Sequence, residues 1–125
     1  VGPSILKGTT VNQHTLRAYD DQLGQLTSSI IEMGANVRDL ILLAKRAVTE
    51  RDEALVEAAR AKDKQINALD RQIEQQATVI LALQNPMAVD IRYVTSSLRI
   101  SIALERVGDL AKNITKRSAK LGEYK

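Results

Sequence analysis

Several residue types are absent or rare in this chain, and each absence removes a class of function. There is no cysteine, which excludes disulfides, thiolate zinc sites and thiol chemistry. There is no Phe or Trp and there are only three Tyr, so stacking of nucleic-acid bases on aromatic side chains has little support. The single histidine, His14, lies in a polar N-terminal stretch, so this chain alone can build neither a Ser–His–Asp arrangement nor a His-rich metal site.

Long apolar runs and an excess of one charge are also missing. No stretch approaches the roughly 20 apolar residues that span a bilayer. The net charge is +3, from 18 basic and 15 acidic residues that are interspersed, so no block indicates binding to nucleic acid or a membrane surface. Hydrophobic residues make up 44% of the chain and prolines number two, which favours a helical bundle built from Leu, Ile, Val and Ala.

Apolar residues recur at steps of three and four, the pattern of helices packed in a bundle. The pattern predicts three helices, over about residues 17–48, 53–83 and 86–121, after a flexible leader at 1–16. The predicted core positions of the first helix are Leu23, Leu26, Ile30, Met33, Val37, Leu40, Ile41, Ala44 and Val48. Those of the second helix are Leu55, Ala59, Ile66, Leu69, Ile73, Ala77 and Ile80.

Short breaks separate the predicted helices. Asp52 can cap the second helix after a turn at residues 49–52, and Asn85–Pro86 can begin the third. Gly122 is a natural stop for that helix. Three helices of roughly 30 residues joined by tight turns must run up, down and up. The predicted fold is therefore all-α, an antiparallel three-helix bundle of spectrin-like architecture.

The third helix carries two apolar stripes. One is centred on Leu98 and includes Met87, Ile91, Val94 and Ile102. The other, on the opposite face, includes Val89, Tyr93, Ile100, Val107 and Ile114. One stripe is enough to dock a helix into a bundle, and a helix that is apolar on both sides is buried on both sides. We infer a second packing surface, covered by another domain, another subunit or a partner protein.

Two carboxylates, Glu105 and Asp109, fall in line with the Leu98 stripe, because residues four apart project from the same face of a helix. Like charges so placed repel unless a cation, a proton or a basic partner neutralises them. One interpretation is metal ligation, since oxygen-only sites suit Mg, Ca, Mn or Fe. The other is a structural acid pair whose charge is neutralised by Arg99, Arg106 or Lys112.

A second polar cluster lies on one strip of the middle helix and comprises Asp63, Asn67, Asp70 and Glu74. If the second and third helices are antiparallel neighbours, this strip could meet the side that carries Glu105. The spacing alone favours the alternative, a solvated acidic edge paired with Lys62, Lys64 and Arg71.

The residues that open and centre the third helix resemble the PhoU family of phosphate-signalling proteins. They are the run Pro86–Met87–Ala88–Val89–Asp90–Ile91–Arg92 and the run Leu104–Glu105–Arg106–Val107–Gly108–Asp109. The likeness extends from about His14 to Lys120 and includes Met33–Gly34 and Asp63–Lys64–Gln65–Ile66–Asn67.

The resemblance implies a function that spacing does not show. PhoU proteins are negative regulators of bacterial phosphate uptake and starvation signalling, and they are thought to link the phosphate transporter and its ATPase subunit to a membrane sensor histidine kinase. A non-enzymatic, cytoplasmic adaptor is therefore expected, with Arg92, Arg99 and Arg106 on one side of the third helix contacting an acidic partner surface. The alternatives are an accessory subunit of a different phosphate permease and a carboxylate metal-binding helical bundle.

The resemblance also implies metal sites and a second repeat. PhoU proteins carry Glu/Asp-x-x-x-Asp motifs that bind divalent or iron-type metal ions in some members, which matches Glu105 and Asp109 and, in the second helix, Asp63. Position 67 departs from the motif, because Asn67 stands where many members have Asp. The family is built from two three-helix repeats, so residues 17–125 are expected to form one repeat, with a second repeat or a homodimer as its partner.

Overall fold

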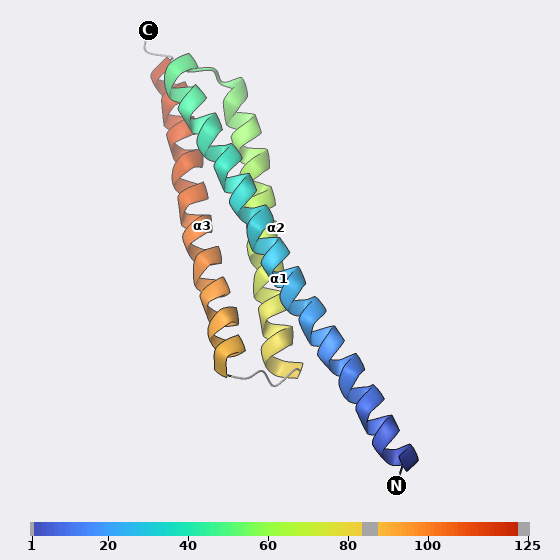
Figure 1. Ribbon diagram of the computed structural model, residues 1–125. Helices are drawn as coiled ribbons and strands as arrows, with labels where there is room; N and C mark the ends of the chain where they lie inside the picture. Colours follow the sequence, from blue (N-terminus) through green and yellow to red (C-terminus); the bar gives the residue numbers. More distant parts are fainter. Residues whose placement is uncertain (1, 84–87, 123–125) are drawn as a thin grey trace.

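Three helices make up the described part of the chain. The computed structural model describes the backbone of residues 2–83 and 88–122, and the side chains of residues 17–83 and 90–121. The helices are α1 (Gly2–Glu50), α2 (Ala54–Leu83) and α3 (Ala88–Gly122). The first and third run in the same direction, α2 runs antiparallel to both, and each helix packs against the other two (Figure 1). The predicted all-α, up-down-up bundle is confirmed.

The first helix begins earlier than expected. The sequence predicted a leader over residues 1–16, whereas the backbone is helical from Gly2 onward and extends past the rest of the bundle (Figure 1). Pro3 falls in the first turn, where its missing N–H costs nothing. Gly8 costs only about 1 kcal/mol relative to Ala inside a helix, too little to end it. Within the described residues, no helix combines the length and apolar character that a membrane crossing requires.

The turn between α1 and α2 has the predicted cap. Arg51 adopts a left-handed backbone with φ 52°, and its N–H donates to the carbonyl of Ala47 at 2.8 Å. Asp52 Oδ1 accepts a hydrogen bond from the N–H of Ala54 at 3.0 Å, which satisfies a free donor at the start of α2. The predicted break at Asn85–Pro86, together with Met87, lies outside the described residues.

Large aliphatic side chains of α1 and α2 form most of the core. The largest that are fully buried are Leu26, Met33 and Leu40 of α1 and Ile66, Ile73 and Ile80 of α2. Every residue predicted for the core of the second helix is buried. In the first helix, Ile41 and Val48 differ from the prediction, because they lie exposed at the edge of the stripe.

The third helix turns mainly small residues inward, which corrects the predicted stripe on Leu98. Val94 is buried and Leu98 is half-buried, but Ile91 and Ile102 are exposed. The other buried positions of α3 are Ser97, Ser101, Gly108, Ala111, Thr115, Ser118 and Ala119. At Gly108, an added Cβ would lie 3.3 Å from Cδ1 of Ile66. Close approach of the helices therefore selects small side chains here, and a search for large apolar residues misplaces the inward face.

Candidate functional site

A cluster of charged groups joins α2 to α3. Lys112 Nζ lies 3.2 Å from Asp63 Oδ2 and 3.3 Å from Asp109 Oδ1. The side chain of Asp63 is only 13% exposed, whereas that of Asp109 is 53% exposed. The hydrogen bond to Asp63 raises the pKa of Lys112 and outweighs the opposing effect of burial. The cluster therefore holds a positively charged ammonium between two carboxylates.

Three of the predicted metal ligands meet in this cluster. Asn67 Nδ2 donates to Asp63 Oδ2 at 3.4 Å. Asp109 is joined to Asp63 indirectly, through the Lys112 ammonium. Glu105 is half-buried one turn before Asp109. The oxygen donors suit a hard cation, but the Lys112 ammonium bridges two of them. Within residues 17–83 and 90–121, no group of three or more His, Cys, Asp or Glu side chains is placed to hold a metal ion.

The acidic strip of α2 meets α3, as one interpretation of the sequence required. Ser101 Oγ donates to Asp70 Oδ1 at 2.7 Å and also lies 3.4 Å from Met33 Sδ of α1. The alternative of a solvated edge is wrong for Asp63 and Asp70, because both bond to the third helix. Lys62, one of its expected partners, bonds instead to α1, at 3.5 Å from Asp39.

The three arginines predicted to bind a partner lie on the outer side of α3. Arg92, Arg99 and Arg106 recur every seven residues and are all exposed. Seven residues are nearly two helical turns, so the three side chains form a row along one side of the helix. None of them forms an ion pair with the described residues. We call this row the arginine row.

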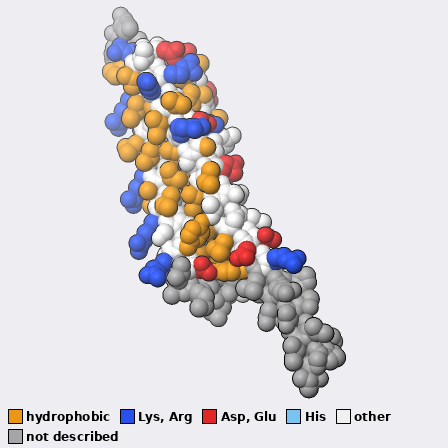
Figure 2. All heavy atoms as spheres, in the orientation of Figure 1, with side chains coloured by type: hydrophobic (Ala, Val, Ile, Leu, Met, Phe, Trp, Pro, Cys, Tyr) orange, Lys and Arg blue, Asp and Glu red, His pale blue; other side chains and the backbone are white. Residues whose placement is uncertain are grey.

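Beside the arginine row runs an exposed apolar surface, as the second stripe predicted. Tyr93, Ile100, Val107 and Ile114 of α3 are 40–47% exposed. The side chain of Val89, predicted for the same stripe, lies outside the described residues. Ile41 and Val48 of α1 are exposed as well. Figure 2 shows hydrophobic side chains along the face where α1 and α3 lie side by side, with basic side chains at the edge of α3. We call these six residues the apolar seam.

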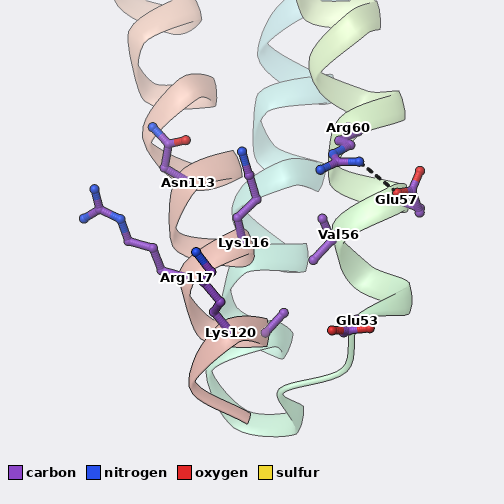
Figure 3. Close-up of a pocket in the computed structure, with 9 residues that line it drawn as sticks. Glu53, Val56, Glu57, Arg60, Asn113, Lys116, Arg117 and Lys120 are labelled. Carbon is purple, nitrogen blue, oxygen red and sulfur yellow. Dashed lines mark hydrogen bonds and ion pairs between the residues drawn. The ribbon is translucent and has the colours of Figure 1, made fainter. Parts of the chain in front are cut away.

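A basic hollow at one end of the bundle escaped the sequence interpretation. Its volume is about 450 Å³, and its lining includes Arg60 of α2 with Lys116, Arg117 and Lys120 of α3. In Figure 3 Arg60 lies beside Glu57, to which it donates at 3.1 Å, and Arg117 points away from α2. Lys116, Arg117 and Lys120 lie within five residues of α3, but Arg60 joins them from α2, so the hollow depends on how the two helices pack. Glu53 and Glu57 offset part of the positive charge.

These features define a class: a three-helix bundle whose distinctive surfaces suit the binding of another protein. Comparison with known families identifies the family. A family model described as the PhoU domain matches residues 30–118, more than half of the chain, so the chain belongs to the PhoU domain family. The resemblance found in the third helix is thereby confirmed.

The relatives share a name and are longer than this chain. A phosphate-specific transport system accessory protein PhoU homolog of Caulobacter vibrioides is 38% identical over 113 residues, covering 90% of this chain and 49% of that protein. The Rhizobium meliloti homolog is 39% identical over 104 residues, covering 83% and 44%. That of Pseudomonas putida is 32% identical over 119 residues, covering 95% and 46%. The chain thus spans about half the length of these relatives. No solved structure matches it significantly.

Proposed function

We propose that this chain is part of a regulator of phosphate transport that represses phosphate-starvation signalling when phosphate is plentiful. The observation that carries the proposal is the PhoU domain match over residues 30–118, with relatives named as accessory proteins of the phosphate-specific transport system. The role is that of a cytoplasmic adaptor without enzymatic activity, which binds the transporter ATPase subunit and a sensor histidine kinase.

The mechanism is one of contact. An adaptor that binds the signalling-off state of its partner more tightly than the signalling-on state shifts the partner's population toward the off state. The exposed surfaces of α3 support this mechanism, because Arg92, Arg99 and Arg106 are exposed and form no ion pair among the described residues.

The test is depletion of the full-length gene followed by a phosphate-starvation reporter in phosphate-rich medium. Constitutive reporter output is the expected result. Complementation then separates the surfaces: a copy with Arg92→Ala, Arg99→Ala and Arg106→Ala should fail to restore repression. A matched copy with Lys64→Ala and Arg71→Ala, two exposed cations of α2, should restore it.

Three other results would contradict or redirect the proposal. Normal repression after depletion would contradict the repressor role. If phosphate uptake alone changed, the accessory subunit of a different permease would become the better explanation. Failure of the arginine variant to differ from the α2 control would leave the repressor role intact and reject this surface as the contact.

A further inference from the structure

The apolar seam is built from two rows in register. The hydroxyls of Thr27 in α1 and Tyr93 in α3 are hydrogen-bonded, and Ser101 Oγ of α3 lies 3.4 Å from Met33 Sδ of α1. Residues 66 to 68 positions apart therefore lie at similar levels of these two helices. Because both helices rise by the same step per residue, residues seven further along each helix again lie level. Gly34 and Ile100, Ile41 and Val107, and Val48 and Ile114 therefore lie at similar levels of the two helices.

This spacing is that of a helix-binding surface. Apolar residues that repeat every seven positions on two neighbouring helices form the holes into which the side chains of a third helix insert. At Gly34, no atom lies within 4 Å of the position that a Cβ would take, which leaves room at that level. Exposed patches of large apolar residues on one face mark interaction sites rather than ordinary surface.

Both edges of the seam are basic. Arg99 and Arg106 of the arginine row flank it on α3, and Arg38 and Lys45 are exposed on α1. Asp39 lies 3.5 Å from Lys62 of α2 and 3.8 Å from Arg38, so Arg38 is partly neutralised and Lys45 is the clearer cation of the α1 edge. Asp109 belongs to the cluster with Asp63.

These charges distinguish a second copy of this chain from a partner of opposite charge as the occupant of the seam. A second copy of this chain, docked through the same face, would bring two sets of basic edges together, and like charges across an interface oppose association. A helix with an apolar stripe between acidic edges would bury the apolar seam and pair its acids with the basic flanks. We propose that the seam between α1 and α3 binds an amphipathic helix of a partner protein, with acidic residues on both sides of its apolar stripe.

This inference rests on the proposed adaptor role, because it names the chemistry of the partner, but its test uses no phosphate readout. The probe is a designed helical peptide of about 28 residues, with Leu at the first and fourth positions of each heptad and Glu at the flanking positions. The control peptide has Lys in place of every Glu. We expect the Glu peptide to bind at least about tenfold more tightly than the Lys peptide, and the difference to shrink at about 0.5 M salt.

Variants of the chain locate the site. Ile100→Ser with Val107→Ser should abolish binding of the Glu peptide and leave the helical circular dichroism unchanged, because both side chains are about half exposed. Arg99→Glu with Arg106→Glu should reverse the preference toward the Lys peptide. The matched pair Lys64→Glu with Arg71→Glu, also exposed and seven residues apart on α2, should bind like the original chain.

Three results would overturn the proposal. Equal affinity for the two peptides, or no binding of either, would reject an acidic helix as the occupant. Binding that persists in the Ile100→Ser, Val107→Ser variant would place the site elsewhere. A dimer in sedimentation that this variant dissociates would make a second copy the occupant. In each case the reporter experiment would still test the phosphate role separately.

Discussion

At the scale of single residues, Lys112 determines what the charged cluster can do. Its ammonium is the cation for Asp63, whose side chain is 13% exposed and has no other cation within hydrogen-bond distance among the described residues. Lys112→Met should lower the free energy of unfolding by about 1–3 kcal/mol, because the largely buried side chain of Asp63 would lose its cation. Urea denaturation measures the loss. The same change at exposed Lys64 should stay within about 0.5 kcal/mol, and an equal loss there would contradict the assignment.

Lys112 also affects whether a metal ion can bind to this cluster. Metal binding remains a prediction. A divalent ion cannot share the space between Asp63 and Asp109 with the ammonium that now bridges them. Lys112→Ala should therefore raise the affinity for Mn²⁺, measured by calorimetry. Adding Glu105→Ala and Asp109→Ala should remove that gain without loss of helicity. If Lys112→Ala binds Mn²⁺ no better than the original chain, these oxygens are not a metal site.

At the scale of elements, Gly108 reports how closely α3 approaches its neighbours. A Cβ there would lie 3.3 Å from Ile66 Cδ1 and 3.8 Å from Leu40 Cδ2. Gly108→Val should destabilise the bundle by about 1–3 kcal/mol through overpacking. Gly34 is the control, since nothing lies within 4 Å of its Cβ position, and Gly34→Ala should stabilise α1 by about 0.5–1 kcal/mol. Thermal unfolding of both variants checks this contrast, and equal effects would refute it.

The same elements explain how far the sequence could predict the structure. Periodicity located the core of α2 because its inward residues include large aliphatic side chains such as Ile66 and Ile73. It misplaced the inward face of α3 because Ser101, Gly108 and similar small residues carry no apolar signal. The site is harder still, because the pairing of Asp63 with Lys112 joins residues 49 positions apart and depends on the register of two helices.

At the scale of the whole molecule, α3 has different surfaces on its two sides. Toward α2 it contributes charged and hydroxyl groups, as in the pairs Lys112–Asp63 and Ser101–Asp70. Toward α1 it presents the apolar seam, and the arginine row lies on its outer side. Polar contacts between α2 and α3 therefore help to set the register inside the bundle, while the side chains of the opposite flank are exposed. On the proposed function, a single helix would serve both folding and recognition.

At alkaline pH, the stability of the whole bundle should fall because of two groups, Tyr19 and Lys112. Burial of its hydroxyl, with the Asp90 carboxylate as a second cause, raises the pKa of Tyr19 from 10.0 to about 12. The hydrogen bond to Asp63 raises the pKa of Lys112 above 10.5. A group whose folded pKa is raised stabilises the fold below its unfolded pKa, and that contribution is lost as the pH rises toward the folded value. Unfolding free energies measured in urea should therefore fall as the pH rises from about 10 to 12. Tyr19→Phe should make that fall shallower, and an unchanged slope in this variant would show that Tyr19 does not contribute.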